Sequence, residues 1–169
     1  MAPMEALSQN ATRALHTERP MDFESFFLEH QEPLFRALWL VTRNRHEAEE
    51  IVQDAFIRVW EHWSGIRDPE AYLYRTAMNV FRSRLRRAAV AVRKAVHALP
   101  VDDQFAEVEA RDSVLRALAP LPDRQRAAVV LVDVLGLSSE QAGDALGIRP
   151  VTVRVLAARG RARLKEAIG

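Results

Sequence analysis

Apolar side chains recur every three or four positions along most of this sequence, the spacing that places them on one face of an α-helix. The spacing predicts a helix over residues 22–41, where Pro33 is expected to kink or divide the run. It predicts a second helix that ends near Gly65 and a third that runs from Pro69 to about residue 97. The expected buried positions are Phe23, Phe26, Phe27, Leu34, Leu38, Val41, Ala48, Ile51, Val52, Ala55, Phe56, Val59, Leu73, Ala77, Val80 and Leu85.

The second half of the chain resumes this spacing after a short acidic stretch. Prolines separate a helix near residues 108–118 from a longer one over residues 123–135. Gly136 supplies a C-terminal cap to the longer helix, and Ser138-Ser139-Glu140-Gln141 forms a capping box for the next one. The expected buried positions of the first of these helices are Val108, Val114, Leu115 and Leu118.

These elements predict an all-α protein of two small helical domains joined by a flexible linker. The first domain is expected over residues 21–97, the linker over 98–106 and the second domain over 107–169. Residues 1–20 are expected to form a disordered extension. A chain of 169 residues with 49% hydrophobic residues is long and apolar enough to build two such cores.

The sharpest local signal is a helix-turn-helix between residues 139 and 156. Such a motif needs small residues inside its first helix, a glycine at the turn, here Gly147, and apolar anchors in its second helix, here Val153 and Leu156. Pro150 suits the first position of the second helix, where its missing N–H needs no partner. An ordinary antiparallel helix pair would share the glycine turn. DNA binding is favoured by the arginines that follow at once, Arg149, Arg154, Arg159, Arg161 and Arg163.

Charge changes this picture, because a near-neutral total hides separate blocks. The chain has 24 basic and 23 acidic residues, for a net charge of +1. Residues 71–101 hold seven basic residues and no acidic one, and residues 145–169 hold six basic residues against one acidic. The segments 21–70 and 102–144 are acidic. Alternation of this kind indicates separate surfaces for separate partners.

In the first basic block, aromatic residues alternate with the basic ones. Tyr72, Tyr74 and Phe81 lie among the arginines, and Asn79 stands in the middle. Aromatic rings beside phosphate-neutralising cations suit unstacked bases, and an Asn amide can bind base edges. The alternative is a solvated helix whose aromatic residues, Phe81 and one tyrosine among them, belong to the core. The arginines of this block are Arg75, Arg82, Arg84, Arg86 and Arg87.

Enzymatic and membrane functions find no support in the sequence. There is no cysteine, no Gly-rich phosphate loop and no nucleophile elbow, and the five histidines are scattered. The segment from His46 to Glu50 has only one histidine, so we expect neither a metal site nor a cofactor. The longest apolar runs are far shorter than a membrane span, and residues 1–20 have no signal-peptide core. A cytoplasmic binding protein is the expectation.

The segment 48–60, with the sequence AEEIVQDAFIRVW, resembles the acidic, Gln-containing helix of the extracytoplasmic-function (ECF) group of sigma factors, in the sigma-70 family. In that family the helix docks on the coiled coil of the largest RNA polymerase subunit. The resemblance covers about residues 22–87 and 110–167. It implies that the polymerase-binding residues are Glu49, Glu50, Gln53, Asp54 and Arg58.

The resemblance also implies two DNA-binding surfaces. The segment 71–79 is similar to the family's helix that melts and binds the minus-ten element, and the connection 63–69 would catch a flipped base. The implied minus-ten residues are Trp63, Tyr72, Tyr74, Arg75, Asn79, Arg82, Arg84, Arg86 and Arg87. The helix-turn-helix would bind the minus-thirty-five element through Arg149, Thr152, Arg154, Val155, Arg159 and Arg161. The implied partners are core RNA polymerase, at its coiled coil and flap, promoter DNA in duplex and melted form, and an anti-sigma factor.

Two departures from the family pattern concern DNA specificity. Ser83 stands where the family usually has Asp, and Leu156 stands where an Arg commonly faces DNA. Leu156 is expected to belong to the helix-turn-helix core. We therefore expect Arg149, Thr152 and Arg154 to carry minus-thirty-five specificity, with Val155 able to touch a thymine methyl.

Two other functions stay open. One is a stand-alone helix-turn-helix repressor or activator, which would not need the acidic helix or the aromatic and basic segment. The other is a sigma-like decoy that sequesters an anti-sigma factor, which would have no reason to keep the two basic blocks.

Overall fold

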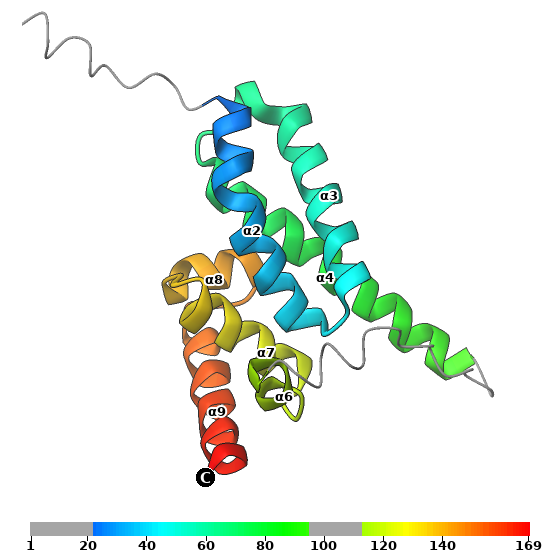
Figure 1. The fold of residues 1–169 in the computed structure, drawn as a ribbon, viewed down its shortest axis with the longest axis vertical. Helices are drawn as coiled ribbons and strands as arrows, with labels where there is room; N and C mark the ends of the chain where they lie inside the picture. The colour runs from blue at the N-terminus through cyan, green and yellow to red at the C-terminus, as the bar shows by residue number, and fades with distance from the viewer. Residues whose placement is uncertain (1–21, 95–112) are drawn as a thin grey trace, which may run out of the picture.

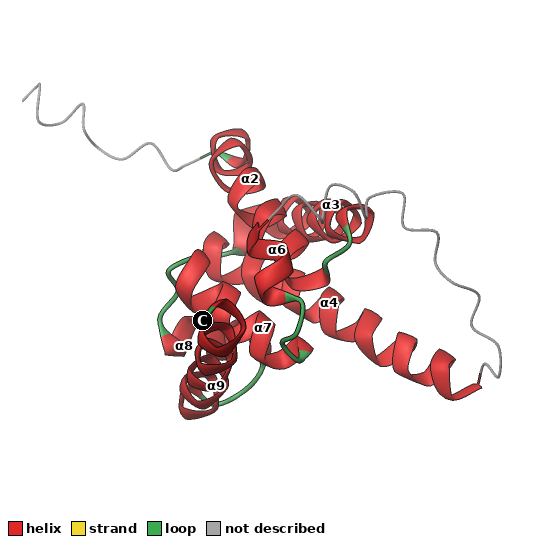
Figure 2. Cartoon of the chain, turned by 60° about the horizontal axis from the view of Figure 1, so that its bottom comes forward, coloured by secondary structure: helices red, strands yellow, loops and turns green. Residues whose placement is uncertain are grey.

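The computed structural model describes residues 22–94 and 113–169, and all regular elements in these ranges are helices (Figures 1 and 2). The all-α prediction is confirmed. The elements are α2 (Phe23–Thr42), α3 (Arg45–His62), the 3-10 helix η1 (Trp63–Gly65), α4 (Pro69–Lys94), α6 (Ser113–Leu118), α7 (Asp123–Val129), the π-helix η2 (Val130–Val134), α8 (Ser139–Leu146) and α9 (Pro150–Ile168). The expected extension over residues 1–20, the end of the third helix at residue 97, the linker and Val108 lie outside the described residues.

The helices α2, α3 and α4 pack together as an N-terminal unit, and each begins at a side-chain cap. Asp22 accepts a hydrogen bond from the Ser25 N–H at 2.8 Å, and Asn44 and Asp68 cap α3 and α4 in the same way, each at 3.0 Å. Pro33 lies inside α2 and does not divide it. Burial of Leu34 and the apolar residues that follow it outweighs the one backbone hydrogen bond that Pro33 cannot make.

The buried face of α4 is wider than the spacing of its apolar residues predicts. Leu73 and Ala77 are buried as expected, but Tyr74, Met78 and Phe81 are buried too, whereas Val80 and Leu85 are only partly covered. The cause is tertiary, since α3 covers one side of α4 and α8 covers another. The C-terminal end of α4 instead projects from the rest of the described helices (Figure 2).

The helices α6 to α9 form a C-terminal unit that contains the predicted helix-turn-helix. The capping box of α8 is present, with Ser138 accepting from the Gln141 N–H at 3.1 Å. Gly147 adopts a φ of +64° at the turn, and a Cβ on Gly143 would come within 2.8 Å of the Ile148 carbonyl oxygen. Both positions therefore require glycine. The prediction that Val114 is buried is wrong, because it lies on the outer side of α6, 39% exposed.

The two units pack against each other. α8 lies on α4, and α6, α7 and η2 lie on α2 (Figure 1). Buried side chains of both units belong to one hydrophobic cluster. The two units follow one another along the sequence, but in space they pack into one body. No helix within the described ranges is both long and apolar enough to span a bilayer.

Candidate polymerase and nucleic-acid interfaces

The acidic helix α3 turns its apolar stripe inward and its charged residues outward. Ala48, Ile51 and Ala55 are fully buried, while Glu49 and Gln53 are exposed. Glu49 pairs with Arg45 one turn earlier at 3.1 Å, an exposed contact of small energetic value. This face is therefore open to a partner.

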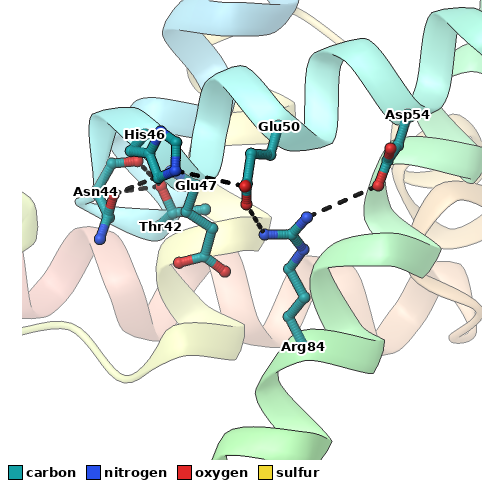
Figure 3. Close-up of polar contacts among 7 residues, drawn as sticks. All are labelled: Thr42, Asn44, His46, Glu47, Glu50, Asp54 and Arg84. Atoms are coloured by element: carbon teal, nitrogen blue, oxygen red, sulfur yellow. Dashed lines mark hydrogen bonds and ion pairs between the residues drawn. The ribbon is translucent and has the colours of Figure 1, made fainter.

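The predicted polymerase-binding residues separate into two groups on α3. Glu50 and Asp54 face α4, where Arg84 lies between them (Figure 3). The Arg84 Nη1 atom is 2.6 Å from Glu50 Oε2, and its Nη2 atom is 3.7 Å from Asp54 Oδ2. The hydrogen bond from Arg84 lowers the pKa of the Glu50 carboxyl, with a smaller contribution from nearby His46. Arg58 is exposed on the same side of α3.

Two exposed apolar residues extend the outward face of α3. Ile57 is 56% exposed and Trp60 is 63% exposed, and the Trp60 ring meets the Phe23 ring edge-on at 4.9 Å. Sequence reasoning did not select either residue. The signal was present, because Ile57 and Trp60 follow Gln53 by four and seven residues and so share its face. We define the α3 outer face as Glu49, Gln53, Ile57 and Trp60.

A hollow of about 590 Å³ opens beside the connection between η1 and α4. Tyr72 and Arg75 line it from α4, opposite the connection itself. Trp63, predicted to bind minus-ten DNA, does not line this hollow. Its ring packs on Phe26 at 5.2 Å and on Phe23 at 5.5 Å. The remaining lining residues are Glu61, His62, Ser64, Gly65, Ile66, Arg67 and Asp68.

The aromatic residues of the first basic block have different environments. Tyr74 and Phe81 are buried, and burial raises the pKa of Tyr74 to about 12. These two rings therefore belong to the core, as the alternative interpretation of the block held. Tyr72 is partly exposed and stays accessible from the hollow.

Several of the arginines predicted to bind minus-ten DNA pair with other groups of the protein. Arg75 pairs with Asp144 of α8, and Arg82 donates hydrogen bonds to the Leu146 carbonyl oxygen and to Asn79. Desolvation lowers the pKa of Arg82, and the nearby cations Arg86 and Arg124 lower it further. Arg86 and Arg87 are exposed.

A second hollow, of about 400 Å³, lies between α3 and α4. It brings predicted polymerase-binding residues beside predicted minus-ten residues and contains Ser83, one of the two departures from the family pattern. Its lining residues are Asp54, Arg58, Asn79, Val80, Ser83, Arg84 and Arg87.

The recognition helix α9 buries Val153 and Ala157 and exposes most of its arginines. Arg149 and Arg159 are exposed and Thr152 is partly buried. Arg154 lies 3.7 Å from Glu140, and Arg161 lies 2.9 Å from Asp133, both in exposed pairs. Val155 is 43% exposed and shares the outermost face of the helix with Val151, which is in keeping with an apolar base contact.

The expectation that Leu156 anchors the helix-turn-helix core is wrong. Leu156 is only partly buried and lines a hollow of about 180 Å³ between α9 and α4. Val153 alone of the two expected anchors lies in the core. Leu156 faces Phe81 and Leu85 of α4 across this hollow.

The described residues contain no group of three or more His, Cys, Asp or Glu side chains that could hold a metal ion.

Comparison with known proteins finds the same two regions. The Sigma-70 region 2 family matches residues 26–90, and the Sigma-70 region 4 family matches residues 111–164. The chain is 36% identical over 151 residues to the ECF RNA polymerase sigma factor SigM of Mycobacterium tuberculosis, covering 87% of this chain and 77% of that protein. It is 30% identical over 152 residues to the RNA polymerase sigma-E factor of Streptomyces avermitilis, covering 86% and 84%.

Two solved structures share the fold over most of the chain. The sigma factor RpoE of Bartonella quintana, in complex with the anti-sigma factor NepR, aligns with a TM-score of 0.71 at 25% identity, covering 87% of this chain and 96% of that one. CnrH, in complex with the cytosolic domain of CnrY, aligns with a TM-score of 0.62 at 26% identity and covers 86% of both chains.

Proposed function

Because this chain belongs to the ECF group of RNA polymerase sigma factors, we propose that it binds core RNA polymerase and directs promoter-specific initiation, with polymerase performing the chemistry. The observation that carries the proposal is the presence of three surfaces on one chain. These are the α3 outer face, the basic face of α4 and the helix-turn-helix. A stand-alone DNA-binding regulator needs only the last of them.

The α3 outer face is the proposed polymerase contact. Gln53 lies at its centre, and the exposed side chains of Ile57 and Trp60 add apolar area that a docking partner would cover. Exposed aromatic and aliphatic side chains of this kind commonly dominate the free energy of a protein interface. Glu50 and Asp54 act on polymerase less directly, because Arg84 already holds them.

The proposed minus-ten site is the hollow beside the connection between η1 and α4. Its volume of about 590 Å³ is ample for a flipped base, and Tyr72 and Arg75 offer a ring edge and a cation. The exposed Arg86 and Arg87 further along α4 would neutralise backbone phosphates. Trp63 would support this loop from the core side instead of stacking on a base.

The proposed minus-thirty-five surface is the exposed side of α9 with its N-terminus. Arg149 and Arg154 flank the apolar Val155, so cations and a methyl-binding residue would enter the major groove together. Arg159 and Arg161 follow along the helix, where they would contact phosphates.

An anti-sigma factor is the proposed regulator. The solved relative RpoE was captured with the anti-sigma factor NepR, and CnrH was captured with the cytosolic domain of CnrY. The exposed apolar residues of the α3 outer face would offer such a regulator an apolar contact.

In vitro transcription tests this function. Core RNA polymerase and a promoter template are incubated with and without the chain, and run-off RNA is measured. A sigma factor makes initiation depend on both the chain and the promoter. A stand-alone regulator would bind the duplex but leave core polymerase inactive, and a decoy would bind an anti-sigma factor and yield no transcript. Either of these results would contradict the proposal.

A further inference from the structure

We propose that the hollow of about 400 Å³ between α3 and α4 is a phosphate-binding site, and that Ser83 makes it one by leaving two arginines without a carboxylate partner. The phosphate group is carried either by a nucleic-acid backbone or by a small phosphorylated compound. The inference rests on the proposed function only for the nucleic-acid source. The site itself rests on the residues that line the hollow.

Cations dominate the lining of this hollow. Arg58 reaches it from α3, and Arg84 and Arg87 reach it from α4. Among the described residues that line it, Asp54 alone carries a carboxylate, so three positive charges face one negative charge. Positive charge gathered in a hollow attracts an anion more strongly than the same charge spread over an open surface, because the walls exclude part of the screening solvent.

The three arginines are not equally available to an anion. Arg84 lies between two carboxylates, with its Nη1 atom 2.6 Å from Glu50 Oε2 and its Nη2 atom 3.7 Å from Asp54 Oδ2 (Figure 3). It thereby offsets the charge of Asp54 inside the hollow. Within the part of the chain that the structure describes, Arg58 and Arg87 form no ion pair. These two exposed guanidinium groups, one on each helix, are free to hold an anion.

The uncharged polar groups of the hollow also suit a phosphate. The side-chain oxygen of Asn79 accepts a hydrogen bond from Arg82, so its amide nitrogen is left to donate. The partly buried Ser83 hydroxyl can donate as well. The oxygens of a phosphodiester accept hydrogen bonds and do not donate them, and guanidinium groups bind phosphate oxygens through paired N–H groups. The hollow therefore offers the donors that a phosphate needs.

Ser83 keeps the two free arginines available. An Asp at this position, the usual residue in the family, would add a second carboxylate to the lining beside Asp54. That carboxylate would compete with a phosphate for Arg58 and Arg87, because both anions use the same N–H donors. Serine removes the competing charge and keeps a hydroxyl that can donate. The departure from the family pattern therefore opens the hollow to an external anion.

The size and position of the hollow fit a phosphate with part of the group that carries it. Its volume of about 400 Å³ lies within the range of about 300–1,000 Å³ that is usual for small-ligand sites. A phosphate held by Arg58 and Arg87 would bridge α3 and α4. The polymerase-docking helix and the DNA-binding helix would then share one ligand.

Replacing Ser83 tests the site on the full chain. Ser83→Asp introduces the competing carboxylate, and the matched control Ser83→Asn has nearly the same shape as that variant without its charge. The probe is inorganic pyrophosphate, and the NMR signals of the arginine side chains report its binding. We expect Ser83→Asp to bind pyrophosphate about tenfold more weakly than Ser83→Asn, since hydrogen bonds to charged groups are among the strongest in proteins.

A second set of variants separates the hollow from the general charge of α4. Ala89→Asp places the same negative charge on an exposed position of α4 outside the hollow, and salt should screen most of its effect. Arg58→Gln removes the cation of α3 without any change at Ser83 and should also weaken pyrophosphate binding about tenfold. Arg116→Gln, which removes an exposed arginine of α6, should leave it unchanged.

A single-stranded minus-ten oligonucleotide, followed by fluorescence anisotropy, identifies the source of the phosphate. If a nucleic-acid backbone supplies it, Ser83→Asp and Arg58→Gln weaken oligonucleotide binding, and the slope of log affinity against log salt falls by about 0.7, the value for one phosphate of a single strand. If a small phosphorylated compound supplies it, these variants change pyrophosphate binding alone.

Equal affinities of Ser83→Asp and Ser83→Asn for both probes would overturn the proposal, as would an Arg58→Gln variant that binds both probes like the wild type. Failure of the proposed function gives a different result. Pyrophosphate binding that depends on Ser83, in a chain that supports no promoter-dependent transcription, would leave the site standing and reject the sigma-factor function.

Discussion

At the scale of single residues, Arg84 and Glu50 show how one contact joins two predicted functions. Glu50 was assigned to polymerase and Arg84 to DNA, yet the two side chains bond to each other at 2.6 Å (Figure 3). Arg84 thereby links α4 to α3. Its charge is shared between two carboxylates and is less available to DNA than the charges of Arg86 and Arg87.

Removing the Arg84 cation should raise the pKa of Glu50 toward its ordinary value. The folded pKa of Glu50 is depressed, so the pair stabilises the fold above the unfolded pKa, and this stability is lost as pH falls through the folded pKa. In Arg84→Gln this acid-dependent contribution should shrink. Carboxyl NMR titration of Glu50 measures the shift, and Arg87→Gln is the matched control on the same helix. A Glu50 pKa that stays equally low in Arg84→Gln would show that another group causes the depression.

Val155 provides a second test at this scale, directed at the thymine-methyl hypothesis. A buried methyl group contributes about 0.8 kcal/mol, so replacing the contacted thymine with deoxyuridine should weaken minus-thirty-five binding about fourfold. The change should have no effect on Val155→Ala, which cannot reach the methyl. Fluorescence anisotropy with the duplex measures both affinities. An equal loss in the variant and the wild type would assign the methyl contact to another residue.

At the scale of elements, α3 has three sides with different environments. Its apolar stripe fills the core, Glu50 and Asp54 face α4, and the α3 outer face points to solvent. Helical periodicity separates the buried side from the rest of the helix. It does not separate the other two, because both consist of polar and charged residues in the sequence.

Truncating Ile57 should weaken binding to core polymerase about tenfold, since an apolar side chain covered at an interface commonly contributes one to two kcal/mol, or about tenfold in affinity. Leu28→Ala is the matched control, because Leu28 of α2 is 62% exposed but does not belong to the α3 outer face. Binding to core polymerase is measured by biolayer interferometry. Equal affinity for the two variants would remove Ile57 from the docking surface.

The double change Gln53→Ala with Asp54→Ala tests the same helix, and unchanged binding of this variant to core polymerase would reject α3 as the docking element.

At the scale of the whole molecule, the buried Arg126 joins the two units through its hydrogen bond to the Val41 carbonyl oxygen. Losing this side chain leaves the Val41 carbonyl oxygen without its partner from the other unit. Arg126→Met should lower the free energy of unfolding by about 3 kcal/mol, because the buried carbonyl oxygens of Val41 and Leu121 lose their donor and each unsatisfied acceptor costs about 1–3 kcal/mol. Arg116→Met, an exposed change on α6, should alter it by less than about 0.5 kcal/mol.

Urea denaturation followed by circular dichroism makes this measurement. One unfolding transition in the wild type and two separate transitions in Arg126→Met would show that Arg126 couples the units. An Arg126→Met variant as stable as Arg116→Met would show that the contact with Val41 contributes nothing across the interface.

The amino-acid sequence by itself determined the local structure and the family. Caps, glycines and apolar spacing depend on neighbouring residues, so the helices, the capping box at Ser138 and the turn at Gly147 could be predicted. The charge blocks likewise indicated the separate surfaces before any contact was known.

Only the tertiary structure decided what each surface faces. The burial of Tyr74 and Phe81, the exposure of Val114 and the position of Leu156 depend on which helix packs on which, through residues distant in the chain. Periodicity reports that a side is buried but carries no information on its partner. For this reason the contacts of Arg75, Arg82 and Arg126 across the two units emerged only from the fold.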